Sequence, residues 1–486
     1  MMSNKRKPTF IEAASTVVMM GLLIGIGYVG LGIRLEPLLI AAAVYSGFIA
    51  HRVGVSWREM EIVISEKVAK AMPAIMIIFV VGILIGTWMF AGTVPMMIYF
   101  GLKMISPQYF LVAAFLITAV ISTATGTSWG SAGTAGVALL GVAQGLGIPL
   151  PQAVGAIVAG SVFGDKMSPL SDTTNLAALV TETNLYDHIR HMLYTTVPAA
   201  GIGCLIYLFI GFQDAGQIVI PENVKTLMDT LDVIYSWNII LLLPPAIIIY
   251  GSLTKRPVIP FMILSAVVAT ALGAMYQGFD IYDGIMSMVK GFNVSMIKID
   301  GFDSENVIWD VTRLINRGGL NAMSGLVLLV LCSYAFAGIV EAAGCLEVLV
   351  APVFKHIKST GSLICTTVLA SIAIVCVAGT SYISMVMLGA LLTDTYKRMG
   401  LHTKNLSRTL EDAGTMVVPF LTWGSSGIYY TEIFGVSPFE YGIWAIPCYL
   451  GFIFAIFYGY TGIAIEKTDY NPEPSESAEI SGLEVA

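Results

Sequence analysis

Residues 164–175 read GDKMSPLSDTTN, and apolar runs flank them on both sides. This stretch carries two carboxylates, an amine, four hydroxyls and an amide. Polar and ionisable groups at bilayer depth are costly, so membrane proteins usually keep them for function. Pro169 and the hydroxyl-rich run also interrupt any helix that enters the stretch. We therefore expect a broken helix with oxygen ligands near the bilayer midplane, an arrangement with which secondary transporters hold ions and substrates.

The composition of the whole chain agrees with a membrane location. Its 486 residues are 56% hydrophobic and only 12% charged, and the mean hydropathy is +0.81. A soluble globular chain carries roughly 25% charged residues. Because apolar runs of transmembrane length recur from end to end, we expect an all-α polytopic membrane protein. The first run, residues 11–31, is too long for a signal-peptide core, so we expect an uncleaved first span.

The remaining composition excludes several kinds of site. The six cysteines are scattered through apolar segments without a CxxC pair, so they are expected to be small buried hydrophobes and not metal ligands. The net charge of −7 comes largely from loops and from the acidic end of the chain. No basic cluster indicates nucleic-acid binding, and no motif indicates a cofactor.

Short motifs of the first half recur in the same order in the second half. Four pairs of motifs in the same order, all in apolar surroundings, predict an internal duplication. The pairs are FAGTV at 90–94 with FAGIV at 336–340, GTS at 126–128 with 379–381, AGS at 159–161 with AGT at 413–415, and Pro169 with Pro419.

The duplication and the charges together predict the order of domains. We expect a cytoplasmic N-terminus (1–10), membrane repeat 1 (11–212), an external linker (213–236), membrane repeat 2 (237–464) and a disordered acidic cytoplasmic tail (465–486). The basic N-terminus and the basic loops of the second half fall on the same side only if the two halves are antiparallel.

The fold class is therefore expected to be two inverted-topology repeats with broken helices or re-entrant hairpins. The number of spans is roughly 11–14, because some segments after the GTS motifs are short or glycine-rich. Two amphipathic stretches, 54–71 and 279–318, are expected to lie along the membrane surface.

The donors in the 164–175 break suit a hard cation such as sodium, which binds oxygen ligands. Loss of water favours the neutral form of a carboxylic acid, so a carboxylate here can hold a proton or a sodium ion in turn. A polar loop at the membrane surface is the alternative. The candidate binding residues are Asp165, Lys166, Ser168, Asp172, Thr173, Thr174 and Asn175.

Two further motifs can contribute to the site. The GTS motifs offer Thr127, Ser128, Thr380 and Ser381, although small residues there can equally serve close helix packing. Residues 411–415 are the counterpart of the first break in the second half, and they offer Asp412 and Thr415 as candidate binding residues. Glu411 is expected to cap a helix near the cytoplasmic face. The candidate sodium ligands are Asp165, Asp172, Asn175 and Asp412.

Several enzyme motifs fail in this context. Residues 126–130 match G-x-S-x-G, but the nucleophile elbow needs a sheet that this chain is not expected to form. His188 and His191 belong to a basic segment that we expect in the cytoplasm. The chain holds no HExxH and no Walker A motif. We expect no enzyme, and an intramembrane serine hydrolase using Ser128 is the remote alternative.

The 164–175 stretch resembles the signature of the NhaC-type sodium/proton antiporter family. The resemblance extends from about residue 41 to residue 459 and includes residues 411–419. It implies sodium/proton exchange by inverted repeats with broken helices. Residues 187–198 resemble a branch of that family that exchanges malate and protons for lactate and sodium.

The expected function is therefore a multi-pass antiporter in the cytoplasmic membrane, with both termini in the cytoplasm. Sodium leaves and protons enter, and Asp165, Asp172 and Asp412 trade one for the other. The alternative is a sodium- and proton-coupled exchanger of small carboxylates, with Lys166 and helix N-termini as positive counterparts. Membrane lipid is the other expected partner, and a homodimer stays open.

Overall fold

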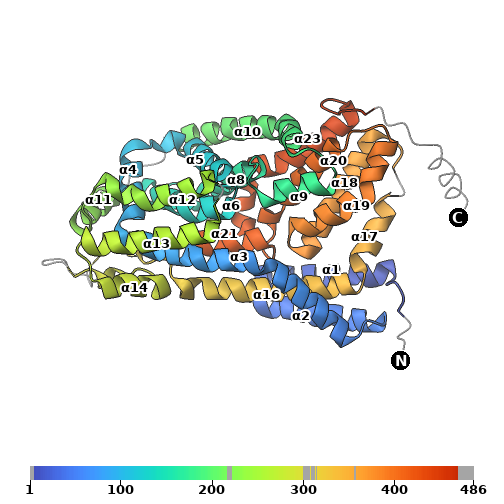
Figure 1. Ribbon diagram of the computed structural model, residues 1–486, viewed down its shortest axis with the longest axis horizontal. Coiled ribbons are helices and arrows are strands. Elements are labelled where there is room, and N and C mark those ends of the chain that lie inside the picture. The colour runs from blue at the N-terminus through green and yellow to red at the C-terminus, as the bar shows by residue number, and fades with distance from the viewer. Residues whose placement is uncertain are drawn as a thin grey trace, which may run out of the picture.

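The computed structural model describes residues 5–215, 222–254, 256–298, 307, 312, 315–354 and 357–468. Figure 1 shows a bundle built of helices. These residues form no β-strand, and two isolated bridges, Phe292 with Arg317 and Leu401 with Lys467, are their only β pairing. The all-α prediction is confirmed.

The first half contains eleven helical elements that matter for the site or its support. They are α1 (Phe10–Leu22), α2 (Leu35–Arg52), α3 (Trp57–Ala91), α4 (Thr93–Met104), α5 (Phe110–Thr125), α6 (Ser128–Ser131), the π-helical η3 (Ala132–Gly136), α7 (Val137–Leu146), α8 (Leu150–Lys166), α9 (Asp172–Val180) and α10 (Leu185–Ala215).

The second half follows a helix in the predicted linker, α11 (Glu222–Ile234). Its elements are α12 (Leu243–Leu253), α13 (Val258–Met275), α14 (Ile281–Lys290), α16 (Leu320–Ala342), α17 (Cys345–Phe354), α18 (Thr360–Ala378), α19 (Ser381–Arg398), α20 (Lys404–Leu410), the π-helical η6 (Glu411–Thr415), the 3-10 turn η7 (Val418–Phe420), α21 (Ser425–Phe434), α22 (Pro438–Tyr441) and α23 (Ile446–Thr461).

By length and apolarity, five helices of the described residues are able to cross a membrane, or up to eight if each bent pair is one span. The polytopic prediction is supported. The expected 11–14 spans stay a prediction, because several apolar segments are divided into helices too short to cross alone. The inverted orientation of the halves also stays a prediction.

The helix α3 differs from the expectation for residues 54–71. Ser56 and Glu59 form a capping box that starts α3, and the helix then continues unbroken to the left-handed Gly92. Residues 57–71 are therefore the first part of a 35-residue helix and not a separate surface helix. The cap starts the helix and the distant glycine ends it, and the helix continues through Pro73 between them.

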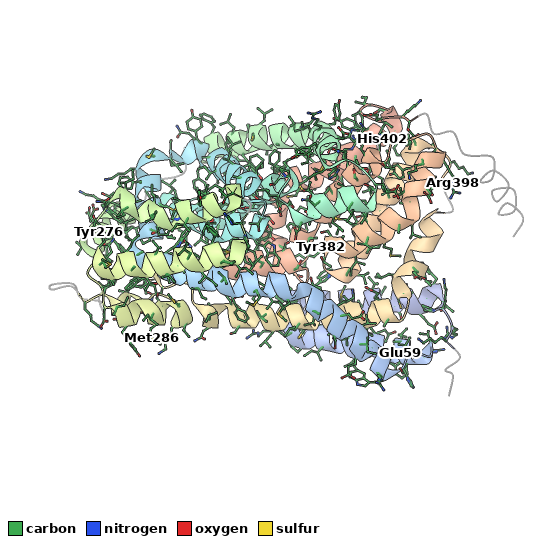
Figure 2. All side chains as sticks on the ribbon, viewed as in Figure 1. Glu59, Tyr276, Met286, Tyr382, Arg398 and His402 are labelled. Carbon is green, nitrogen blue, oxygen red and sulfur yellow. The ribbon has the colours of Figure 1, made fainter. Side chains whose placement is uncertain are left out.

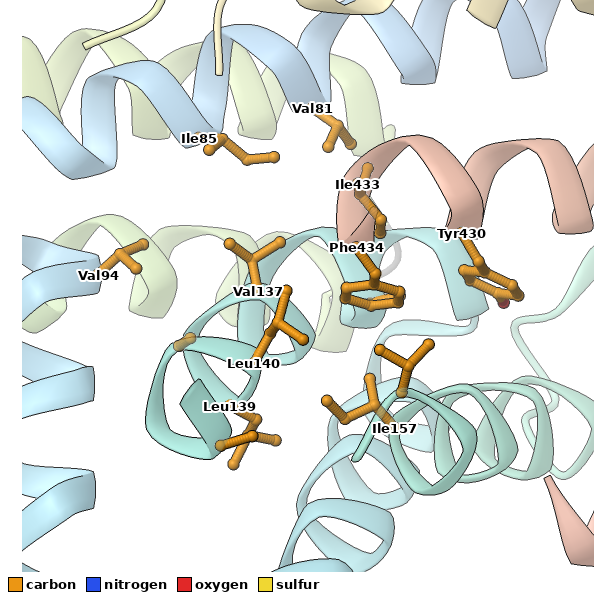
Figure 3. Close-up of a cluster of buried hydrophobic side chains, with 14 of the residues drawn as sticks. Val81, Ile85, Val94, Val137, Leu139, Leu140, Ile157, Tyr430, Ile433 and Phe434 are labelled. Atoms are coloured by element: carbon orange, nitrogen blue, oxygen red, sulfur yellow. The ribbon is translucent and has the colours of Figure 1, made fainter. Parts of the chain in front are cut away.

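The core joins the two halves of the chain. Figure 3 shows side chains of α3, α7, α8 and α21 that converge on one centre, among them Val81, Val137, Ile157 and Phe434. The rings of Trp129 and Tyr429 stack nearby with centroids 4.8 Å apart. Since α21 belongs to the second half, this core fixes α21 against the first half.

Glycines let α8 lie directly on α5. A Cβ on Gly160 would lie 2.2 Å from Phe115 O, and one on Gly164 would lie 2.2 Å from Ala119 O. Small residues four apart allow helix backbones to approach closely. This contact sets the position of Asp165 and Lys166, which follow Gly164 directly.

The two GTS motifs have the same local geometry. Gly126 (φ 68°) ends α5 and Gly379 (φ 69°) ends α18, both left-handed. The next residues, Thr127 and Thr380, are extended N-caps of α6 and α19. Each glycine also contacts the helix break of its own half, at Leu170 and at Trp423. The local correspondence agrees with the predicted duplication.

Different parts of the chain lie at the two ends of the long axis of the molecule. Figure 1 shows that α1 begins and α23 ends at the same end of this axis. Figure 2 places Arg398 and His402 toward that end, and Tyr276 and Met286 toward the other.

Candidate functional site

The first helix break lies between α8 and α9, as the sequence predicts. Its own polar side chains hold it in shape. Thr174 Oγ1 donates to Lys166 O at 2.9 Å, and Ser168 Oγ accepts from Leu170 N at 3.2 Å. Asn175 Nδ2 donates to Pro169 O at 2.9 Å and to Ser171 O at 2.6 Å. Thr174, Ser168 and the Asn175 amide nitrogen therefore shape the break.

Asp172 forms the exposed edge of this break. It begins α9, and its Oδ1 accepts from the Thr173 amide at 2.9 Å. Its Oδ2 accepts a hydrogen bond from the Tyr382 hydroxyl of α19. Asp172 and Asn175 are exposed, whereas Thr173 and Thr174 are buried. Asp172 thus links α9 to α19 at an accessible edge.

Asp165 lies one step deeper, on the last turn of α8. Its side chain is only 7% exposed, and its Oδ1 finds no hydrogen-bond partner among the described residues. The hydroxyl groups of Ser128 and Ser171 and the carboxylate of Asp172 act on it electrostatically. Ser128 thereby joins the first break, as the sequence predicts for the GTS motif.

The second break brings Asp412 to Lys166. The π-helical segment η6 follows α20 and is followed by the 3-10 turn η7, so this helix is also interrupted. Lys166 Nζ donates to Asp412 Oδ1, and both side chains are fully buried. Thr195 Oγ1 of α10 donates to the same oxygen at 3.1 Å. The pair joins the first half to the second half at the two breaks.

Glu411 lies inside this site, which corrects the expectation of a helix cap at the surface. It is 0% exposed, and neither of its carboxylate oxygens has a hydrogen-bond partner in the described chain. Thr415, Lys166, Asp165 and Asp412 act on it electrostatically. The helical segment η6 continues from α20 directly into the interior of the protein, so both consecutive acids, Glu411 and Asp412, are buried. Asp165, Glu411 and Asp412 are called the carboxyl cluster below.

The other predicted residues lie around this cluster at different distances. Thr415 is 8% exposed, and its hydroxyl is beside Glu411. Thr127 Oγ1 accepts from Gly130 N at 3.2 Å and lines a small cavity of about 50 Å³. Thr380 is beside the Tyr334 hydroxyl, and Ser381 O accepts from Ser384 Oγ at 3.0 Å. The contacts of Thr127, Thr380 and Ser381 are thus local to the two junctions.

Three buried basic side chains were missed by the sequence reasoning. His188 and Arg408 are 0% exposed and His191 is 3% exposed, although both histidines were expected in a basic segment in the cytoplasm. His188 Nδ1 lies 2.8 Å from Ser407 Oγ, and His191 Nε2 lies 3.2 Å from Asn405 Oδ1. The packing of α20 on α10 buries both rings. His188, His191 and Thr195 share one helical face, which was the signal available in the sequence.

Residues 463–468 close the outer end of α20. Arg408 Nη1 donates to Ala464 O at 2.8 Å, and His402 N donates to Glu466 O at 3.0 Å. Lys404 forms an ion pair with Glu466. Residues 469–486 of the predicted acidic tail lie outside the described residues.

The donor set at the site suits a weakly held cation. Within the described ranges, no group of three or more His, Cys, Asp or Glu side chains is arranged to hold a metal ion. The carboxyl cluster instead combines acids with a buried amine and with hydroxyl groups. Oxygen donors of this kind are the ligands that sodium prefers.

Comparison with known proteins agrees with this geometry. A sequence model of the "Na+/H+ antiporter family" matches residues 8–174 and 160–463. The chain is 45% identical to an "Uncharacterized Na(+)/H(+) antiporter" of Haemophilus influenzae, covering 95% of this chain and 98% of that protein. It is 34% identical to the "Na(+)/H(+) antiporter NhaC" of Alkalihalophilus pseudofirmus, covering 90% and 91%. It is 33% identical to the "Malate-2H(+)/Na(+)-lactate antiporter" of Bacillus subtilis, covering 98% and 99%. This chain belongs to the Na+/H+ antiporter family.

Proposed function

We propose that this protein exchanges sodium for protons across the cell membrane, and that the carboxyl cluster carries the exchange. Sodium/proton antiport is the activity that the family match and the NhaC relatives support. The single observation that carries the proposal is the set of four carboxylate oxygens without a hydrogen-bond partner in the described residues: Asp165 Oδ1, Glu411 Oε1 and Oε2, and Asp412 Oδ2.

Buried carboxylate oxygens without partners store unfavourable free energy. A buried charge is costly unless it is paired and hydrogen-bonded. A proton relieves this cost by neutralising the group, and a sodium ion relieves it by coordination. Because both ligands act on the same oxygens, binding of one disfavours binding of the other. Competition of this kind couples outward sodium movement to inward proton movement.

Besides the proton-bound and sodium-bound states, the site has a third state in which Lys166 neutralises it. Its ammonium group holds Asp412 while neither ligand is there, so the acid is never left without a counterion. A sodium ion that reaches Asp412 has to displace this ammonium group. The pair spans both halves of the chain, so its opening also changes the contact between the two breaks.

The exposed edge at Asp172 is the proposed entrance. The Tyr382 hydroxyl holds its carboxylate between α9 and α19. Asp172 acts electrostatically on the buried Asp165. A cation attracted to Asp172 is thus led toward the carboxyl cluster.

The membrane location follows from charge and helix composition. We place the chain in the cytoplasmic membrane with both termini inside, because the basic N-terminus and the basic loops of the second half predict that side. The chain is a transporter, and we assign it no enzymatic reaction and no cofactor.

A carboxylate exchanger is the second candidate, and one observation favours it. Arg408 is fully buried, yet its Nε and Nη2 find no acceptor in the described part of the chain. An arginine of this kind suits a planar carboxylate ligand. One relative is named as a malate-2H(+)/Na(+)-lactate antiporter.

The experiment uses purified full-length protein in liposomes with a preset pH gradient. Sodium pulses that collapse the gradient without any organic acid support sodium/proton exchange. A response that requires malate or lactate supports the carboxylate exchanger. The variant Glu411→Gln should lose the response, whereas Asp394→Asn, an exposed acid on α19, should keep it. A wild-type protein that responds to none of these cargoes contradicts both candidates.

A further inference from the structure

His188 is a buried titratable group that the exchange described above does not use. It lies on the first turn of α10, and its side chain is 0% exposed. Its Nδ1 is 2.8 Å from Ser407 Oγ. Its Nε2 has no hydrogen-bond partner from any described residue. A buried ring nitrogen of this kind needs an explanation, because proteins normally satisfy such groups.

The hydrogen bonds of Ser407 fit one tautomer of the neutral ring, in which Nδ1 carries the hydrogen. Ser407 Oγ donates its single hydrogen to Lys404 O at 3.1 Å. The oxygen of Ser407 is therefore an acceptor toward His188, so the neutral ring carries its hydrogen on Nδ1. Nε2 is then left with the lone pair. The structure thus presents a proton acceptor inside the protein.

The acceptor lies on the helix face that reaches the Lys166–Asp412 pair. His188 and Thr195 are seven residues apart on α10, so they share a face and lie about 10 Å apart along the axis. Thr195 Oγ1 donates to Asp412 Oδ1 at 3.1 Å, and Lys166 donates to the same oxygen. The positive charge of Lys166 also acts on the His188 ring and repels a positive charge there. A short chain of water molecules or a movement of the long Lys166 side chain would span such a gap.

The start of α10, next to His188, is accessible. The neighbouring Asp187 and Arg190 are exposed. The ring therefore lies between an accessible helix end and the buried pair. The charged and titratable groups of the elements packed on this part of α10 include Asp165 and Lys166 of α8, Asp172 of α9, Lys404, Arg408, Glu411 and Asp412 of α20 and η6, and Tyr458 of α23, with Asp187, Arg190, His191 and Tyr194 on α10 itself.

We propose that His188 relays protons between the carboxyl cluster and the water at the start of α10, an inference that rests on the proposed function. Nε2 takes up the one proton that sodium displaces from the cluster, and the ring becomes an imidazolium ion. Nε2 then passes that one proton to water, and the neutral ring returns. Ser407 keeps Nε2 directed away from itself throughout, because it holds the opposite nitrogen.

Two transport assays on the same liposomes separate a relay from a structural role. The first measures sodium-driven proton flux with a trapped pH-sensitive dye. The second measures exchange of radioactive for unlabelled sodium at equal pH on both sides, which moves no net proton. The variant His188→Gln should lower the proton flux about 10- to 100-fold, in line with the usual contribution of a proton-transfer group. Sodium-for-sodium exchange should stay near the wild-type rate.

His191→Gln is the matched control. His191 is buried on the same helix, and its Nε2 contacts Asn405 Oδ1, which also accepts from Glu466 N at 3.1 Å. Both rates should stay near wild type in this variant. Equal loss of both rates in a folded His188→Gln protein would show a structural role and overturn the relay. Unchanged proton flux would overturn it as well.

A second variant guards against failure of His188→Gln to fold. His188→Gly leaves space for a free imidazole, so added imidazole should restore proton flux if the ring is a relay. Failure of imidazole to restore the flux counts against the relay. A wild-type protein without sodium-driven proton flux defeats the proposed function first, whereas a wild-type flux that survives in both His188 variants defeats the relay alone.

Discussion

At the scale of single residues, the largest effect on stability is expected at the buried ion pair of Lys166 and Asp412. Removal of one partner leaves the other charge enclosed and uncompensated, which costs about 3–5 kcal/mol. We expect Lys166→Met and Asp412→Asn each to abolish exchange and to lower the melting temperature in detergent. Replacement of both, as Lys166→Met with Asp412→Leu, should recover much of the stability without activity. A double variant as unstable as the singles would contradict this account.

Asp172 makes a different prediction, because it is exposed. Asp172→Asn should leave stability within about 0.5 kcal/mol of wild type, as is usual for surface positions. Coupled exchange should nevertheless be lost, since the entrance loses its charge. Normal transport with wild-type sodium dependence in this variant would remove Asp172 from the site.

The matched change on the neighbouring helix is Tyr382→Phe, which keeps the ring and removes the hydroxyl that donates to Asp172. Loss of this hydroxyl leaves the Asp172 carboxylate free to turn away from α19, at a small cost in stability because the position is exposed. We expect a weaker apparent affinity for sodium with a maintained maximal rate. The measurement is the sodium dependence of the proton flux.

At the scale of the element, the contact of α8 with α5 sets where Asp165 and Lys166 lie. A Cβ on Gly164 would lie 2.2 Å from Ala119 O, so Gly164→Ala must push the helices apart. We expect a lower melting temperature and slower exchange. Gly201→Ala is the control, because nothing lies within 4 Å of its Cβ position on α10. Since alanine is favoured over glycine in a helix by about 1 kcal/mol, this variant should be as stable as wild type or more so.

The two junction glycines give a second comparison between elements. Both are left-handed, so alanine costs about 1–2 kcal/mol at either position. At Gly126 the new Cβ would also lie 2.8 Å from the Leu170 backbone carbon, whereas at Gly379 the nearest atom is 3.2 Å away. Gly126→Ala should therefore lower the melting temperature more than Gly379→Ala. A larger loss of melting temperature for Gly379→Ala would contradict the closer contact of Gly126 with the first helix break.

At the scale of the whole molecule, the predicted sidedness is open to direct measurement. Tyr276 and Arg398 lie toward opposite ends of the long axis (Figure 2), and both are exposed. In a variant without cysteine, Tyr276→Cys should react with an impermeant maleimide added to intact cells. Arg398→Cys should react only after the membrane is opened. Labelling of both from one side would rule out the predicted topology of the second half.

The sequence allowed the broken helix to be predicted, because Pro169 and the hydroxyl run act locally. It also allowed the all-α class to be predicted, because apolar length decides that property. Glu411 and His188 could not be placed in the same way. Both lie in charged local surroundings, next to Arg408 and between Asp187 and Arg190, that are typical of solvated segments. The packing of α20 on α10, which lie far apart in the chain, buries them.

The contacts of residues 463–468 have a practical consequence for shortened versions of the protein. A stop codon at Ile463 would delete the carbonyl that receives the Arg408 guanidinium and the acid that neutralises Lys404. The inner end of the same helix carries Glu411 and Asp412, so such trimming would loosen the helix that delivers both acids. Purification tags and fusion partners therefore belong after Thr468, whose amide is still bound to Gly400 O at 2.9 Å.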